Sequence, residues 1–156
     1  MSNKMSGLTS KYLEDFGKKY CKIFLGVFPS DIHPNIENCE KFSLIFNESA
    51  HDQEGTHFVS VYANKKKIFL MDSLGLKCEN ENILEFLKSS KRDIIETKKQ
   101  IQSFDSIYCG YFSISFVFFM CLNESPAKFL KIFSIKNLEA NNKIVVDLII
   151  CLLKKD

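Results

Sequence analysis

The fold is decided by the apolar stretch at residues 109–122, which is CGYFSISFVFFMCL. Phe112, Ile114 and Phe116 alternate with smaller residues, and this alternation is typical of a strand. The length of the stretch favours a helix, because strands rarely exceed about 10 residues and a fully buried helix is apolar on every face. We therefore predict a buried helix that begins at Cys109.

The first two residues of this stretch, Cys109 and Gly110, carry the most informative chemistry. At the start of a helix, the thiolate of Cys109 would lie at the positive end of the helix dipole, where free N–H groups lower the thiol pKa. Such a cysteine is a good nucleophile. Gly110 would let a substrate backbone approach closely, and the backbone N–H groups of Cys109 and Gly110 are candidates to bind an oxyanion.

A nucleophilic thiolate needs an imidazole partner, and the imidazole needs an anion that fixes its tautomer. The runs at 57–63 and 67–72 are rich in β-branched and aromatic residues and predict a β-hairpin. His57 and Asp72 lie at its open ends, so they share one face if the connecting loop has an even number of residues. Either a two-residue turn at Asn64-Lys65 or a four-residue loop at 63–66 meets this condition.

The other candidates for chemistry are Gln102 and the two remaining histidines. Gln102 stands seven residues before Cys109, and a side-chain amide is able to donate to an oxyanion. His33 and His51 lie in polar loop sequence, and we assign neither a catalytic role. The sequence has no Cys-x-x-Cys or His-x-x-x-His pair, so we predict no metal site and no required cofactor.

Periodicity and capping residues predict the remaining elements. Helices are expected at 11–20 behind Thr9 and Ser10, around 83–87 behind Asn80 or Asn82, at 127–133 behind Ser125-Pro126, and at 143–153. A strand is expected at 42–46, and Ile94, Ile95 and Ile101 mark one or two further strands before Gln102.

The composition bounds the class of protein. The chain has 156 residues, of which 46% are hydrophobic and 26% charged, so we expect one globular domain over residues 1–156 and no disordered or fibrous protein. A net charge of +2 is too weak to predict affinity for nucleic acid or membranes by itself. The apolar stretch at 109–122 is shorter than the roughly 20 residues that cross a bilayer, so we expect no membrane partner.

The polar N-terminal sequence lacks the apolar centre of a signal peptide. We therefore expect a protein that stays inside the cell, with all six cysteines reduced. We also expect it to be a monomer.

Taken in order, the candidate residues resemble the adenovirus-type maturation protease family, the adenains, and more distantly the cysteine proteases of ubiquitin-like proteins. The resemblance rests on Gly55-Thr56-His57-Phe58, Met71-Asp72-Ser73-Leu74-Gly75, Gln102 and Cys109-Gly110, with Phe24-Leu25-Gly26 upstream. It covers about residues 23–122. The seven-residue step from Gln102 to Cys109 is the step of the adenains, and the chain is close in length to a bare catalytic core.

The resemblance implies an α+β fold, a papain-like core in which a mixed sheet packs on a central helix that begins at the catalytic cysteine. It makes Cys109 the nucleophile, His57 the general base and acid, Asp72 the residue that orients His57, and Gln102 an oxyanion donor. Asp72 does not separate the two branches, because adenain-type enzymes often carry Glu at this position and the ubiquitin-like proteases carry Asp.

The resemblance also implies partners. The substrates would be viral precursor proteins of the capsid or core, cut after small residues such as Gly-Gly, in the virion and the host nucleus. Adenain is activated by DNA and by a disulfide-tethered peptide. Lys65, Lys66 and Lys67 are the candidate DNA contacts, whereas Cys78 lies too close after Gly75 to match the tethering cysteine.

Two other functions remain open on the sequence. One is a deubiquitinase-like or SUMO-protease-like enzyme that uses the same residues on ubiquitin-like proteins. The other is a catalytically silent descendant that binds nucleic acid or capsid.

Overall fold

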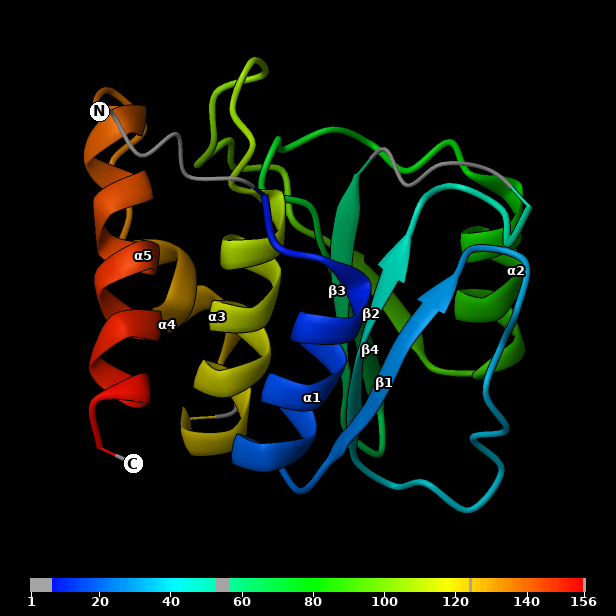
Figure 1. Ribbon diagram of the computed structural model, residues 1–156. Coiled ribbons are helices and arrows are strands. Elements are labelled where there is room, and N and C mark those ends of the chain that lie inside the picture. Colours follow the sequence, from blue (N-terminus) through cyan, green and yellow to red (C-terminus); the bar gives the residue numbers. More distant parts are fainter. Residues whose placement is uncertain (1–6, 53–56, 124, 156) are drawn as a thin grey trace.

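A mixed five-stranded sheet with the order β1-β2-β3-β4-β5 forms the centre of the molecule (Figure 1). The computed structural model describes residues 7–52, 57–123 and 125–155. The strands are β1 (Phe24–Pro29), β2 (Phe42–Asn47), β3 (Phe58–Ala63), β4 (Lys67–Met71) and β5 (Asp93–Glu96). The helices are α1 (Ser10–Tyr20), α2 (Glu81–Ser89), α3 (Cys109–Asn123), α4 (Pro126–Lys131) and α5 (Leu138–Leu153). The outer strand pairs β1–β2 and β4–β5 are parallel, and the two inner pairs are antiparallel.

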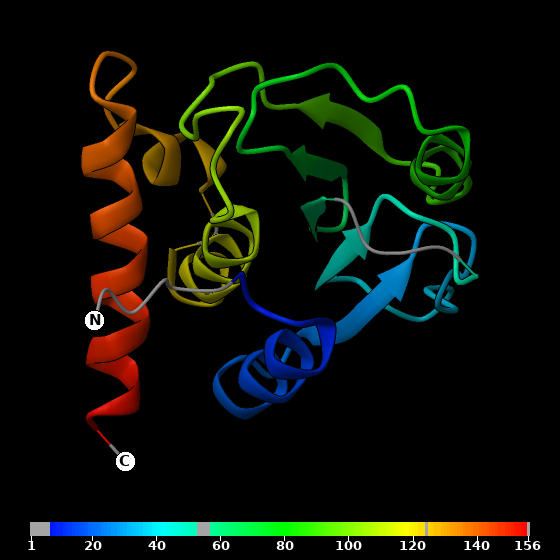
Figure 2. The ribbon, with the colours of Figure 1, turned by 45° about the horizontal axis from the view of Figure 1, so that its top comes forward.

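Helices cover both faces of the sheet, so the inner strands are buried on both sides. Figures 1 and 2 show α1 and α3 on one face, α2 on the other, and α5 outside α3. One core cluster joins α1, α3, α4 and α5 to sheet residues such as Ile45 and Met71. A second cluster joins the opposite face of the sheet to Ile83 and Phe86 of α2. This arrangement explains why β2 and β3 have apolar side chains on both faces.

The central helix α3 begins at Cys109, as predicted. It contacts the sheet through β3 and β2, and it also contacts α1, α4 and α5. Phe112, Ile114, Phe116 and Val117 are each at most 1% exposed although they lie on different sides of the helix. The strand-like alternation of the sequence is therefore a by-product of a helix that is buried all round.

The predicted capping residues act as expected. The side chains of Thr9, Asn80 and Ser125 accept backbone hydrogen bonds at the starts of α1, α2 and α4. The last helix begins at Leu138, five residues earlier than predicted, and is capped by Asn137. Of the further strands expected before Gln102, only β5 forms in the described chain, and Ile101 is buried in a loop.

The β3–β4 hairpin is confirmed, and its turn is shifted by one residue from the predicted positions. Ala63 pairs with Ile68, and the N–H of Asn64 donates to the carbonyl of Lys67. The loop therefore has an even number of residues, as required. The turn is centred on Lys65 and Lys66 because the side-chain oxygen of Asn64 accepts the backbone N–H groups of Lys66 and Lys67.

One cysteine prediction is wrong. Cys21, at the end of α1, and Cys121, in the last turn of α3, form a disulfide, with their Cα atoms 5.9 Å apart. The two residues are separated by 100 positions in the sequence, and only the packing of α1 and α3 brings them together. Cys39, Cys78, Cys109 and Cys151 are free thiols. Within the described ranges, no helix has the length and apolar character needed to span a bilayer.

Candidate active site

Cys109 is the first residue of α3 and is only partly exposed. Burial raises the pKa of its thiol, but the hydrogen bond with His57 and the backbone N–H groups of Phe58 and Gly110 outweigh burial, so the net pKa is lowered. Backbone N–H groups at a helix start stabilise a negative charge. The geometry therefore favours the thiolate form of Cys109.

His57 lies directly before β3 and bridges the thiol and a carboxylate. Its Nε2 atom is 2.8 Å from Oδ1 of Asp72, and the ring also interacts with the thiol of Cys109. Burial alone would lower the pKa of the imidazole. The hydrogen bonds with Asp72 and Cys109 act in the other direction and raise that pKa to about 10. A protonated imidazole between a carboxylate and a thiolate is a pre-formed ion pair.

Asp72 follows the last residue of β4 and is 7% exposed. Its Oδ1 atom accepts hydrogen bonds from Nε2 of His57 and from the backbone N–H of Leu74 at 2.9 Å. The backbone N–H of Asp72 donates to Oγ1 of Thr97 at 3.3 Å. These contacts fix the carboxylate, which in turn fixes the ring of His57. The structure therefore brings together Cys109, His57 and Asp72, three of the four predicted catalytic side chains.

Gln102 is buried in the loop that precedes α3, and its side-chain amide is hydrogen-bonded to Ser73 and Ser106. Its side-chain NH2 donates to the carbonyl oxygen of Ser106 at 3.1 Å and to Oγ of Ser106 at 3.2 Å. Its Oε1 atom accepts from the hydroxyl of Ser73. The amide has no described contact with Cys109, so its role as an oxyanion donor stays a prediction.

The surroundings of Gly110 differ from the expectation of an open approach for substrate. A β-carbon at Gly110 would lie 3.2 Å from Cβ of Leu8 and 3.6 Å from side-chain atoms of Leu13 and Phe58. The space beside Gly110 is filled by the chain itself, because this side of the helix start faces the core. What Gly110 contributes to the site is its backbone N–H, which is directed at Cys109.

Sequence analysis missed Glu48, which lies next to the catalytic pair. Its carboxylate, the ring of His57 and the carboxylate of Asp72 have ligand atoms within 4.8 Å of one another. Burial raises the pKa of Glu48, and the positive charge of His57 opposes this shift. The backbone N–H of Glu48 donates to the carbonyl of His57, since β2 and β3 pair up to Asn47 and Phe58. Only this register could have revealed Glu48.

Among the described residues, Glu48, His57 and Asp72 form the one cluster whose ligand atoms lie close enough together to hold a metal ion. Nε2 of His57 is already hydrogen-bonded to Asp72, so a cation at this place would compete with the catalytic arrangement. A cavity of about 310 Å³ opens beside Glu48, His57 and Asp72. Its lining does not include Cys109.

The remaining sequence candidates lie apart from this site. Lys65, Lys66 and Lys67 are exposed at the opposite end of the β3–β4 hairpin from His57 and Asp72. Lys65 lies 3.9 Å from Glu40 in a pair whose side chains are both 80% exposed. Their contact with DNA stays a prediction. The Gly55 and Thr56 positions of the family motif lie outside the described residues.

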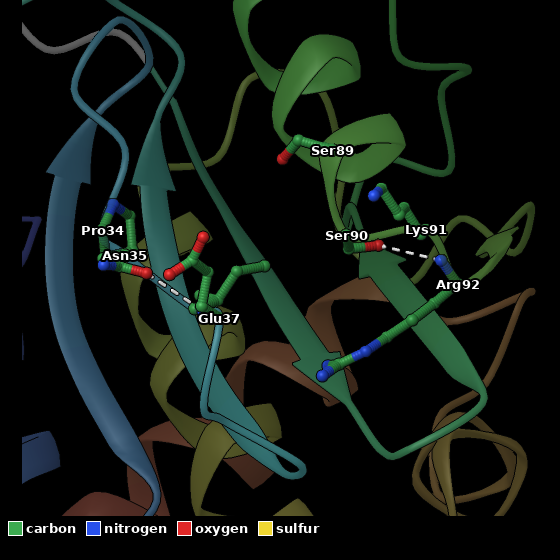
Figure 3. Close-up of a pocket in the computed structure, with 8 residues that line it drawn as sticks. Pro34, Asn35, Glu37, Ser89, Ser90, Lys91 and Arg92 are labelled. Carbon is green, nitrogen blue, oxygen red and sulfur yellow. Dashed lines mark hydrogen bonds between the residues drawn. The ribbon is translucent and has the colours of Figure 1, made fainter.

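A second cavity, of about 540 Å³, lies between residues 34–37 and 89–92 (Figure 3). Its lining includes none of the catalytic candidates. The guanidinium of Arg92 donates to the carbonyl of Cys39 and lies 5.1 Å from the centre of the Phe42 ring, so it packs against the sheet. This cavity is not part of the candidate site.

No protein-family model matches the sequence, and no curated protein is significantly similar to it. The solved structures give a different result. The fold is similar to that of the ASFV pS273R protease. One crystal structure of that protease has a TM-score of 0.60 at 15% identity, covering 82% of this chain and 62% of the protease. A selenomethionine crystal structure has a TM-score of 0.51 at 16% identity, covering 69% and 43%.

In both matches this chain spans less than two thirds of the length of the pS273R protease. At these identities the likeness shows a shared fold and does not transfer an activity. The likeness does not point to the adenain fold in particular. The mixed sheet and the α+β class agree with the expected fold, whereas the finer adenain-type core rests on the sequence motifs alone.

Proposed function

We propose that this protein is a cysteine peptidase in which Cys109, His57 and Asp72 form the catalytic triad. One observation carries the proposal. The His57 ring is hydrogen-bonded to Asp72 and also interacts with the helix-start thiol of Cys109, and the two pKa shifts favour a thiolate and an imidazolium. The protease fold of the structural neighbours supports the same reaction class.

In the proposed reaction, the Cys109 thiolate attacks the carbonyl carbon of the scissile amide and forms a C–S bond, while the carbonyl electrons move to oxygen. The tetrahedral intermediate collapses, and the departing amine takes a proton from the imidazolium of His57. Water then attacks the acyl-enzyme, with His57 accepting its proton, and the thiolate of Cys109 is released. Backbone N–H groups near Cys109 and the amide of Gln102 are the candidate donors to the oxyanion.

The substrates that fit the sequence motifs are viral precursor proteins of the capsid or core, cut after small residues such as Gly-Gly. This is the adenain-type part of the proposal, and it is supported by the order and spacing of the four motif residues. The viral origin of the neighbouring protease agrees with it. A panel of Gly-Gly capsid-type peptides and ubiquitin-like reporter fusions distinguishes this specificity from that of a ubiquitin-like-protein protease.

The test of the reaction class is the substitution Cys109→Ala in the full chain. We expect it to abolish cleavage of Gly-Gly peptides and labelling by a peptide vinyl sulfone, with circular dichroism unchanged. Cys151→Ala is the matched control, because Cys151 is an exposed free thiol on α5. Cleavage by Cys109→Ala at the wild-type rate would refute the assignment. A wild-type protein that binds DNA but is never labelled would favour the silent descendant.

A further inference from the structure

Ser73, the residue after Asp72, is attached to the segment that contains Gln102 by three hydrogen bonds. Its backbone carbonyl accepts the N–H groups of Ile101 at 2.9 Å and of Gln102 at 3.0 Å. Its hydroxyl donates to Oε1 of Gln102. Both Ser73 and Gln102 are 1% exposed, so water does not compete for these bonds. Neither the proposed mechanism nor the motif analysis gives Ser73 a role.

The surroundings determine the orientation of the Gln102 amide. The carbonyl oxygen of Ser106 is only able to accept, so the end of the amide that meets it at 3.1 Å must be the NH2 group. The opposite end is therefore Oε1, and the Ser73 hydroxyl must donate to it. Without this hydroxyl, a buried amide oxygen would lose its described partner, and the energetic preference for one orientation would fall.

The oriented amide also connects to the nucleophile. Oγ of Ser106 accepts a hydrogen bond from the Gln102 NH2 group and another from the backbone N–H of Tyr108, each at 3.2 Å. The carbonyl of Tyr108 accepts the N–H of Phe112 in the first turn of α3. A path of hydrogen bonds therefore runs from the residue beside Asp72 to the helix start that presents Cys109.

A close backbone approach supports the same junction. Gly75 has a φ of +71°, and its N–H donates to the carbonyl of Asp72 at 2.9 Å. A β-carbon at Gly75 would lie 2.6 Å from the backbone nitrogen of Gln100. The turn at 73–75 and the segment at 100–102 therefore pack backbone to backbone, which keeps Ser73 within reach of Gln102.

We propose that Ser73 is a positioning residue for the peptidase reaction, which it serves by fixing the Gln102 amide with its NH2 group directed at the loop before Cys109. This inference rests on the proposed function. Only the NH2 end of the amide is a donor, and this orientation keeps that end, rather than Oε1, on the side of the loop before Cys109. Ser73 itself does not touch the reacting atoms in this scheme.

The first experiment is a double-substitution cycle with Ser73→Ala and Gln102→Ala, read as kcat and KM on a Gly-Gly peptide. Loss of one hydrogen bond predicts that Ser73→Ala lowers kcat roughly fivefold with KM nearly unchanged. Gln102→Ala is expected to lower kcat on the order of 100-fold. In the Gln102→Ala background, Ser73→Ala should have less than about a twofold effect, because it acts through Gln102. Equal effects in both backgrounds would overturn the proposal.

Ser60→Ala is the matched control for this cycle. Ser60 is a buried serine of β3 whose hydroxyl has no hydrogen-bond partner in the described structure, so its removal breaks no such contact. We expect Ser60→Ala to leave kcat and KM unchanged. A loss of kcat in Ser60→Ala equal to that in Ser73→Ala would show that removing any buried hydroxyl near the site is enough, and would contradict the specific role of Ser73.

A second measurement does not depend on turnover. Solvent exchange of the Gln102 side-chain NH2 group, followed by NMR in the full chain, should be slow in the wild type and roughly fivefold faster in Ser73→Ala. Unchanged exchange would overturn the orienting role. If the wild type neither cleaves nor is labelled at Cys109, the proposed function and the catalytic part of this inference both fail. If the wild type is active and Ser73→Ala behaves like it, only the inference fails.

Discussion

Two histidine–aspartate pairs occur among the described residues, and they differ in their surroundings rather than in their chemistry. His57 and Asp72 have side chains that are 12% and 9% exposed, and His57 also contacts a thiol. His51 pairs with Asp31 on the surface, where its side chain is 60% exposed. Both pairs raise the pKa of the histidine. A short contact between the two residue types is therefore not enough to identify a catalytic site.

The two pairs differ in burial and in whether a thiol lies beside the histidine. Inside the protein, a hydrogen bond between charged groups is weakened less by water and salt than at the surface. The imidazole of His57 is held by Asp72 and interacts with the thiol at the start of α3. Among the described contacts of His51 there is no thiol or other nucleophile. The two pairs offer matched substitutions that separate a catalytic carboxylate from a surface one.

The largest expected effect comes from removing the buried carboxylate. Asp72→Asn takes away the acceptor that fixes the tautomer of His57, and we expect kcat/KM to fall by on the order of 10² to 10⁴. Asp31→Asn makes the same change in the exposed pair and should leave kcat/KM within about twofold. Steady-state peptide cleavage with both variants measures the contrast. Equal losses in the two variants would remove the distinction between the pairs.

The next effect concerns pH. Cys109 has a lowered pKa and His57 a pKa of about 10, so cleavage should begin below pH 9 as the thiolate forms and fall as pH rises through about 10.

The folded-state pKa of His57 lies above its unfolded value near 6.5. Its contribution to stability is therefore complete below about pH 6.5 and is lost as pH rises through about 10.

Alkylation by iodoacetamide, followed by mass spectrometry of each cysteine across this pH range, measures the thiolate of Cys109 directly. Cys78 serves as an internal reference, because burial raises the pKa of its thiol. We expect Cys109 to react at a lower pH than Cys78, and Asp72→Asn to shift the Cys109 profile upward. Identical profiles for the two thiols would contradict an ion pair with His57.

A smaller effect is expected from Glu48, the second carboxylate beside the buried pair. Glu48→Gln removes a negative charge near His57, so the pKa of the imidazole should fall and the alkaline limb of the activity profile should move to lower pH. The change in kcat at the optimum should stay below about tenfold. An unchanged alkaline limb would show that Glu48 is electrostatically silent.

Local signals were sufficient for much of the fold and for the catalytic triad candidates. Thr9, Asn80 and Ser125 cap their helices through hydrogen bonds that span three residues, so the sequence alone places them. The start of α5 was missed, because the only buried residue of its first turn is the polar Asn141. The amide of Asn141 donates to the carbonyl of Ile101, which is far away in sequence.

The parts that escaped the sequence depend on long-range packing. Glu48 meets His57 through the register of β2 on β3, and the Cys21–Cys121 disulfide depends on how α1 packs on α3. The same limit applies to the two histidines. Sequence order singled out His57, but the partner of His51 became visible only when Asp31 lay beside it. Ser73 likewise gains its meaning from its contact with Gln102.

The smallest expected effect lies at the far end of the hairpin that carries His57 and Asp72. The side chain of Lys65 is 80% exposed at the turn, so Lys65→Ala and Lys66→Ala together should change stability by less than about 0.5 kcal/mol and peptide cleavage by less than about twofold. If the turn contacts phosphates, the double variant will weaken binding to a DNA duplex and reduce its salt dependence. If both DNA affinity and cleavage are unchanged, the lysines of the turn have no functional role, and the charged groups of this hairpin that matter are His57 and Asp72 at its other end.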